Sequence, residues 1–301
     1  MNRPERTTHL AAQADPSKRL VLEDVSIVVP TLGRDTLQEC LLRIARGSVW
    51  PGRLIIVDQG RRPVVADWLN SLEEAGLNTL YIPSLGTGRA SGLNEGLHEV
   101  KTPFVAITDD DCFVDASWLE VLVEALRTRP DIVASGRVLA GGDSVILTAT
   151  SEERTEYRRP RLNFDRLSGG NMATSMAVLR KVGAFDESTY LRTAEDGEWI
   201  YRALRAGVGL IYEPRMVVTH MDWREAEARS EQYRSYARSH GGFYGKYLRR
   251  GDWFIGVRAA IHFVRAFRTM LRGLLTGNNE LRIMGRSYLA GLPGGILNGL
   301  R

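Results

Sequence analysis

The sequence of 301 residues has few cysteines and no long hydrophobic run. Its two cysteines, Cys40 and Cys112, are too few for a disulfide framework or a cysteine-based zinc site, which favours a reducing compartment. Residues 1–20 lack the apolar stretch that a signal peptide requires. The longest run without a formal charge, residues 287–300, is rich in glycine and shorter than the roughly 20 apolar residues of a spanning helix. We therefore expect a cytoplasmic protein without a membrane-spanning segment.

The composition is that of a folded protein, and its charge is unevenly distributed. Hydrophobic residues make up 44% and charged residues 25%, which excludes wholesale disorder. Residues 224–301 carry 14 Lys and Arg against 5 Asp and Glu, whereas residues 1–223 carry 26 against 31. The length allows one large domain with an appendage, or two modest domains. The charge predicts a polar tail at 1–23, an acidic-leaning domain at 24–223 and a basic region at 224–301.

Apolar runs alternate with amphipathic stretches along the first half of the chain. Strands are predicted at residues 25–30, 54–58, 79–83 and 104–108, and helices at 35–45, 64–74, 90–100 and 118–127, the first with Asp35 as N-cap. Further strands are predicted at 132–139, 144–149 and 217–220, and further helices at 174–182 and 195–206. This order predicts an α/β fold with a mostly parallel central sheet flanked by helices, followed by a basic helical extension.

Three consecutive aspartates, Asp109, Asp110 and Asp111, follow the apolar run 104–107. Open parallel sheets bind their ligands at the carboxyl ends of the strands. Neighbouring carboxylates repel one another unless solvent or a cation neutralises them, and oxygen ligands suit magnesium and manganese. An acidic turn before the next helix is the alternative. The position at the end of a buried strand favours a metal site.

Five segments, in this order, resemble the family 2 glycosyltransferases of GT-A fold. They are an opening strand, a second strand, an Asp-x-Asp element, a small-residue loop and a Glu-Asp motif, found at residues 25–31, 54–60, 109–111, 168–172 and 193–199. The resemblance covers residues 25–223. It implies a Rossmann-like GT-A fold and transfer of a sugar from a nucleotide sugar, most readily a UDP-sugar, with inversion at the anomeric carbon.

The resemblance also implies a role for each matched residue in the donor site. Those expected to contact the nucleotide are Pro30, Thr31, Asp58, Asp109 and Asp110. Arg89 and Asn94 are expected there from their position after the third predicted strand and not from the resemblance, and a solvated helix face explains them nearly as well. Asp111 and Asp109 would ligate a divalent cation, manganese or magnesium, with His220 as a further ligand. The pattern leaves open whether Asp109 works with Asp111 or with Asp110, and His220 equally suits a structural role.

The acceptor side is assigned in the same way. Asp196, next to Glu195, would be the general base that deprotonates the acceptor hydroxyl. Gly170, Asn171 and Trp199 would line the sugar and acceptor pocket. The acceptor would be a saccharide or a polyprenyl-linked saccharide of cell-envelope or polysaccharide biosynthesis. Acids also favour a helix N-terminus, and an asparagine after two glycines also favours a turn.

Two other functions are compatible with parts of the sequence. The loop Gly86–Gly92 resembles the glycine fingerprint of a dinucleotide-dependent oxidoreductase, although two strand–helix units precede it and its spacing is one residue too long. A membrane-bound adaptor that retains a degenerate fold would use only the basic C-terminal region.

The basic region contains one strongly amphipathic stretch, which begins at Trp253. Its apolar residues recur at steps of three and four, namely Phe254, Val257, Ile261, Val264, Phe267, Leu271 and Leu274. Arg258, Arg265 and Arg272 recur every seven residues on another face. The pattern fits a helix in a membrane interface, peripheral on the inner face of the cell membrane, and equally a helix packed on the catalytic domain. Nucleic acid is not expected, because the aromatic residues share the apolar face.

Overall fold

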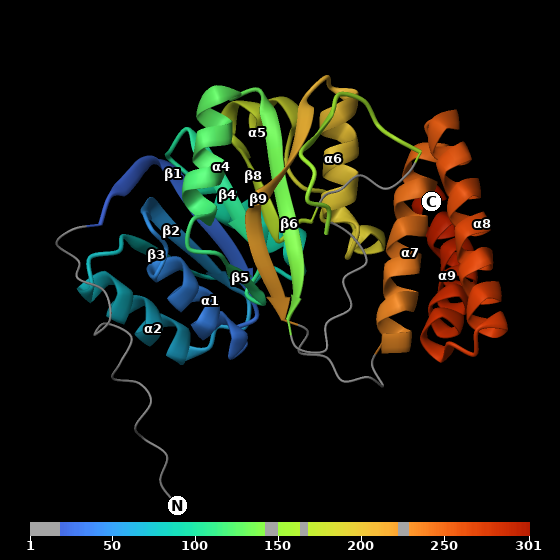
Figure 1. Ribbon diagram of the computed structural model, residues 1–301, viewed down its shortest axis with the longest axis horizontal. Coiled ribbons are helices and arrows are strands. Elements are labelled where there is room, and N and C mark those ends of the chain that lie inside the picture. Colours follow the sequence, from blue (N-terminus) through green and yellow to red (C-terminus); the bar gives the residue numbers. More distant parts are fainter. Residues whose placement is uncertain (1–18, 142–149, 163–167, 222–228) are drawn as a thin grey trace, which may run out of the picture. The chain divides into compact units, whose positions relative to one another are not determined.

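The computed structural model describes residues 19–141, 150–162, 168–221 and 229–301 (Figure 1). The chain divides into two compact units. The sheet unit comprises Met1–Arg159, Arg166–Phe185 and Ile200–Asp222, and the helical unit comprises Pro160–Asp165, Asp186–Trp199 and Trp223–Arg301. The domain boundary expected near residue 223 lies outside the described residues.

Within the described residues, the strands of the sheet unit form one nine-stranded sheet in the order β3-β2-β1-β4-β8-β6-β9-β5, with β7 beside β9. The strands are β1 (Val21–Thr31), β2 (Trp50–Asp58), β3 (Thr79–Pro83), β4 (Phe104–Thr108), β5 (Cys112–Val114), β6 (Ile132–Gly141), β7 (Thr155–Tyr157), β8 (Asn171–Ser175) and β9 (Gly209–Met221). Strands β1 to β4 pair in parallel, as do β6 and β9. Strand β8 runs antiparallel between β4 and β6. The predicted α/β class with a mostly parallel central sheet is confirmed.

The helices of the sheet unit follow from the predicted periodicity. They are α1 (Thr36–Ala45), α2 (Pro63–Glu74), α3 (Arg89–His98), α4 (Trp118–Thr128) and α5 (Met176–Val182). Helix α1 buries Leu37, Leu41 and Ile44, which recur at steps of three and four. Helix α3 packs directly on β1, because a Cβ on Gly96 would lie 2.5 Å from Val28 Cγ1. This close contact fixes the position of α3 on β1, and with it the position of the first turn of α3 at the edge of the sheet.

The helical unit contains the short helix η3 (Thr189–Leu191), the start of α6 (Glu195–Arg205), α7 (Arg229–Leu248), α8 (Trp253–Leu275) and α9 (Asn279–Leu300). Helices α7, α8 and α9 lie side by side (Figure 1). Helices α7 and α9 meet through glycines, since a Cβ on Gly295 would lie 2.0 Å from the Arg238 carbonyl oxygen. The predicted C-terminal helical extension is thus present. None of the described helices combines the length and the hydropathy needed to cross a bilayer.

Several predicted boundaries need correction. Strand β1 begins at Val21, earlier than the predicted residue 25. The helix predicted from residue 174 begins at Met176, because Thr174 and Ser175 belong to β8 and pair with β4. Asp35 is the N-cap of α1 but makes no capping bond, and its carboxylate accepts a hydrogen bond from Arg62 instead. The strand predicted at 144–149 lies outside the described residues.

Candidate functional site

The three aspartates form the turn that links β4 to β5. This turn is closed by a hydrogen bond of 3.0 Å from the Cys112 amide to the Asp109 carbonyl oxygen. Strand β5 then pairs antiparallel with β9, which places Cys112 opposite His220. As a result, His220 Nε2 lies 3.7 Å from Asp111 Oδ1. The long-range pairing of β5 with β9 therefore brings the expected third ligand to the expected carboxylate.

Asp109 is held between helix α3 and the loop before β8. Its Oδ1 accepts a hydrogen bond of 2.6 Å from Nε of Arg89, in the first turn of α3. On the other side, Gly170 packs so closely that a Cβ there would lie 2.8 Å from Asp109 Oδ2. The Thr108 hydroxyl fixes this loop by donating to the Gly170 carbonyl oxygen at 2.9 Å. The fold thus brings Arg89, Asp109 and Gly170 together, and their contacts with a nucleotide sugar stay a prediction.

The ligand atoms around Asp109 and Asp111 suit a divalent cation. One ligand atom each of Asp109, Asp111 and Cys112 lies within 4.8 Å of the others. Burial, together with the neighbouring carboxylates, raises the pKa of the Cys112 thiol well above its usual value, which disfavours the thiolate. Burial and the charge of Asp109 raise the pKa of Asp111 to about 6. The two carboxylates, with the His220 imidazole 3.7 Å from Asp111, offer ligands that suit magnesium or manganese.

Asp110 points away from this group, toward β1. Its carboxylate accepts a hydrogen bond of 2.6 Å from the Thr31 hydroxyl and forms an ion pair of 2.9 Å with Arg34. Burial raises the pKa of Asp110, while the bonds from Thr31 and Arg34 oppose that rise. These contacts give Asp110 a structural role, and the nucleotide contact expected of it stays a prediction. Asp109 and Asp111 are the two members of the triplet that share a site.

The ends of β1 and β2 also carry buried side chains. Pro30 and Thr31 are buried, and Thr31 stands beside Asp58 in the parallel register. The fully buried Asp58 accepts hydrogen bonds from the amides of Gly60 and Arg62 and from the Tyr81 hydroxyl. These three donors hold the turn after β2. The contact of Asp58 with the base stays a prediction.

Three further predicted site residues are packed within the protein. Asn94 exchanges two hydrogen bonds of 2.9 Å with the backbone of Phe185. Asn171 is buried in β8, where its amide oxygen accepts from Trp118 and its nitrogen donates to the Met216 and Arg137 carbonyls. Trp199 has no exposed surface. These contacts show a structural role for each side chain, and their contact with a ligand stays a prediction.

The predicted acid pair opens helix α6 in the helical unit. Glu195 is buried and Asp196 is half-buried, and Asp196 Oδ1 accepts a hydrogen bond of 2.6 Å from the Gly197 amide. Acids in the first turn are stabilised by the helix dipole. Asp196 is the member of the pair with the larger exposed surface, as a base acting on a substrate requires.

Glu198, in the same helix, belongs to a buried network of ion pairs with Lys246 and Asp186 that was not predicted. Glu198 accepts hydrogen bonds from Lys246 Nζ at 2.6 Å and from the Tyr247 hydroxyl at 2.7 Å. Lys246 also donates to Asp186 at 2.7 Å. Burial would raise the pKa of Asp186, but the bonds from Lys246 and Ser188 lower it to about 2. The one sequence feature that could have pointed to this network is that Lys246 is the single lysine after residue 181.

The mixed sheet with paired aspartates after β4 places the sheet unit in the GT-A class of glycosyltransferase folds. The chain belongs to glycosyl transferase family 2, which it matches over residues 26–187. This membership displaces the oxidoreductase interpretation of Gly86–Gly92. That loop follows β3 at the edge of the sheet, and Gly92 lies inside α3, against Pro30.

Curated relatives support the family assignment. The pre-mycofactocin glycosyltransferase of Mycobacterium tuberculosis is 27% identical over 222 residues, covering 70% of this chain and 45% of that protein. The chondroitin synthase of Escherichia coli is 23% identical over 232 residues, covering 64% of this chain and 34% of that protein. The chain therefore spans less than half the length of these two relatives.

Solved structures establish the fold. A mannosyltransferase of Pyrobaculum calidifontis in complex with GDP-Man and Mn²⁺ superposes with a TM-score of 0.60 at 16% identity, covering 95% of this chain and 88% of that one. TarS residues 1–349 of S. aureus, in complex with UDP-GlcNAc, gives a TM-score of 0.57 at 14% identity, with 90% of each chain covered.

Proposed function

We propose that the protein is a glycosyltransferase that moves a sugar from a nucleoside diphosphate sugar to an acceptor hydroxyl with the help of a divalent cation. The observation that carries this proposal is that ligand atoms of Asp109 and Asp111 lie within 4.8 Å of each other after β4, with His220 Nε2 of β9 3.7 Å from Asp111 Oδ1. Open α/β sheets bind ligands at this edge. Membership of glycosyl transferase family 2 supports the same reaction.

In the donor site, Asp109 and Asp111 would hold the cation, with His220 as the further ligand. A bound magnesium or manganese ion supplies positive charge where the departing diphosphate becomes more negative. Arg89 orients Asp109 through its bond of 2.6 Å, and Gly170 leaves the room that this carboxylate occupies. The solved relatives hold UDP-GlcNAc or GDP-Man, and we propose a UDP-sugar as the donor.

The acceptor is activated by a carboxylate in this proposal. Asp196 takes the proton of the acceptor hydroxyl while the new bond to the anomeric carbon forms and the bond to the diphosphate oxygen breaks. The diphosphate leaves with the electron pair, and a single displacement of this kind inverts the anomeric configuration. A positioned general base contributes about 10²–10⁴-fold in rate. We propose a saccharide or a polyprenyl-linked saccharide of the cell envelope as acceptor.

The test is a panel of nucleotide sugars, each assayed with manganese for thermal stabilisation and for slow release of the nucleoside diphosphate. We expect one donor to stabilise the protein and to be hydrolysed. The Asp196→Asn variant should keep that stabilisation but lose about 10²-fold or more of turnover. Asp67→Asn, at an exposed position of α2, is the matched control and should change neither. Unchanged turnover in Asp196→Asn, or no stabilisation by any donor, contradicts the proposal.

A further inference from the structure

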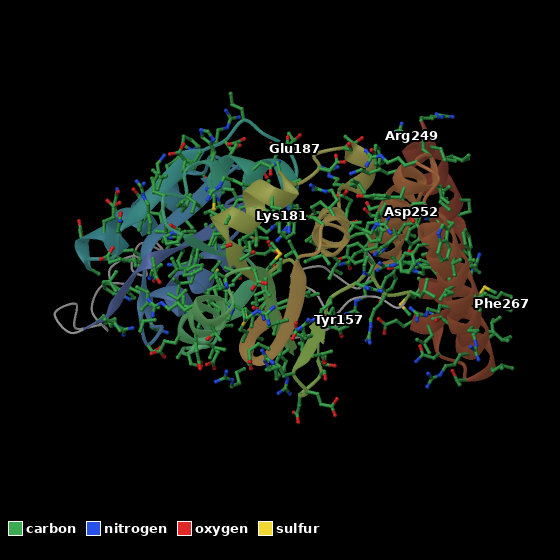
Figure 2. The ribbon with its side chains drawn as sticks, turned by 90° about the horizontal axis from the view of Figure 1, so that it is seen from above. Tyr157, Lys181, Glu187, Arg249, Asp252 and Phe267 are labelled. Atoms are coloured by element: carbon green, nitrogen blue, oxygen red, sulfur yellow. The ribbon has the colours of Figure 1, made fainter. Side chains whose placement is uncertain are left out.

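Helix α8 is oriented with its large apolar side chains outward. The residues that it buries are Ile255, Arg258, Ala259, His262, Ala266 and Gly273. Its exposed large apolar residues are Trp253, Val257, Val264, Phe267, Leu271, Leu274 and Leu275, with Trp253 76% and Leu275 79% exposed. These residues recur along one face of the helix, and Phe267 marks its outer side in Figure 2. An exposed apolar row of this length marks an interaction surface.

Close packing of the helical unit fixes this orientation. A Cβ on Gly273 would lie 2.4 Å from the Arg282 amide nitrogen, and a Cβ on Gly285 would lie 2.5 Å from that of Met270. Helices α8 and α9 are therefore too close to admit large side chains between them. The buried face is further held by His262, whose Nδ1 lies 2.9 Å from the Tyr244 hydroxyl. Helices that pack in an apolar environment place small residues between them and turn their large apolar residues outward.

Arginines border the apolar face. Arg268 and Arg272 are exposed along one side of it, and Arg249 and Arg250 are exposed in the turn before Trp253. Residues 229–301 hold 13 Lys and Arg against 3 Asp and Glu, and α8 itself has no acidic residue. A second copy of this helix would set arginine rows of like charge near each other, without carboxylates on α8 to pair with them. An anionic lipid surface complements both the apolar row and the arginines.

We propose that α8 lies in the interface of an anionic lipid bilayer, with its apolar row among the acyl chains and its arginines at the phosphate groups. Trp253 and Phe254 stand at the start of the helix, and aromatic side chains favour the headgroup level. The helix rests on the surface and does not cross it, which agrees with its limited hydropathy. Lipid docking is independent of the proposed transfer reaction, and it would bring the protein to the surface that carries lipid-linked acceptors.

The test is cosedimentation of the full chain with vesicles of phosphatidylcholine, with and without phosphatidylglycerol. We expect binding to the anionic vesicles only, weakened by salt. Leu274→Ser with Leu275→Ser should weaken binding about tenfold or more, because each leucine loses acyl-chain contact. Arg268→Gln with Arg272→Gln should weaken it by about 30-fold, since each charge near an anionic surface contributes about 5.4-fold.

The matched control is Leu20→Ser with Leu85→Ser, which removes two leucines of similar exposure, 63% and 80%, from the sheet unit. Its vesicle binding should equal that of the unchanged protein. Thermal unfolding of all variants verifies that they remain folded. Absence of binding to anionic vesicles, equal binding to uncharged vesicles, or an equal loss in the control overturns the proposal. A dimer that Leu274→Ser with Leu275→Ser dissociates, without vesicle binding, also overturns it and makes a second copy the partner.

Discussion

Replacing Lys246 by methionine should destabilise the protein strongly. The Lys246 side chain is 7% exposed, and its ammonium lies 2.6 Å from the carboxylate of Glu198, which has no exposed surface. It also lies 2.7 Å from Asp186. Methionine fills a similar volume but removes the ammonium from the buried Glu198 carboxylate, which keeps its hydrogen bond of 2.7 Å from the Tyr247 hydroxyl. The perturbation therefore isolates the loss of a buried charge partner.

The expected loss is about 3–5 kcal/mol in the free energy of unfolding, the usual cost of removing one partner of a buried ion pair. This is a large share of the roughly 5–15 kcal/mol by which a domain is stable. Adding Glu198→Gln to Lys246→Met should recover at least about 1 kcal/mol, because a neutral amide has a far smaller cost of burial than a carboxylate.

Urea unfolding followed by far-UV circular dichroism measures these differences. Lys181→Met is the matched control, because Lys181 is exposed on α5 (Figure 2) and should be nearly neutral. A loss in Lys246→Met no larger than that of the control would refute the reasoning. So would strictly additive effects of Lys246→Met and Glu198→Gln.

Two further predictions concern the metal site and the buried histidines. Gly170→Ala should weaken Mn²⁺ binding, since its Cβ would lie 2.8 Å from Asp109 Oδ2. The control Gly294→Ala, whose Cβ meets nothing within 4 Å, should leave Mn²⁺ binding unchanged. Calorimetric titration of both variants with Mn²⁺ measures the difference. Burial, with nearby positive charge, lowers the pKa of His240 to about 4 and that of His262 to about 3, from 6.5. The unfolded chain then takes up protons near pH 6.5 that the folded protein refuses, so stability is full above pH 6.5 and falls as the pH drops toward 4. The slope is at most about 1.4 kcal/mol per pH unit for each histidine, and a flat unfolding profile across this window contradicts it.

The strands and helices of the first half could be predicted because their signals are local. The apolar run 54–58 lies inside β2, and the amphipathic stretch 35–45 nearly coincides with α1. The position of Asp109 and Asp111 at the carboxyl end of β4 follows from that alternation. That Arg89 and Gly170 contact Asp109 follows from the packing of α3 and of the loop before β8, because the sequence assigned them separately to the nucleotide and to the sugar pocket.

The partners of the buried polar side chains could not be predicted. The side chain of Asn171 is of a type that often contacts ligands. In the fold it donates to the carbonyl oxygens of Arg137 and Met216, which are distant in sequence. Asp110 looks equivalent to its neighbours until the fold sets Thr31 and Arg34 against it. Such contacts depend on strand pairing, which a local pattern does not specify.

The orientation of α8 was equally undetermined. An amphipathic pattern has an apolar face whether that face packs on a protein or lies on a lipid surface. The choice is made by Gly273 and Gly285, which bring α8 and α9 too close for large side chains. This information lies in the spacing of two helices and not in the periodicity of one.

The central claim is that Asp109 and Asp111 hold a divalent cation at the edge of the sheet. Calorimetric titration of Mn²⁺ in the presence of UDP tests it most directly, in the unchanged protein, in Asp109→Asn with Asp111→Asn, and in the control Asp67→Asn. The unchanged protein and the control should bind Mn²⁺ alike, and the double variant should bind at least about 100-fold more weakly while remaining folded. Binding of Mn²⁺ by the double variant with undiminished affinity would contradict the account.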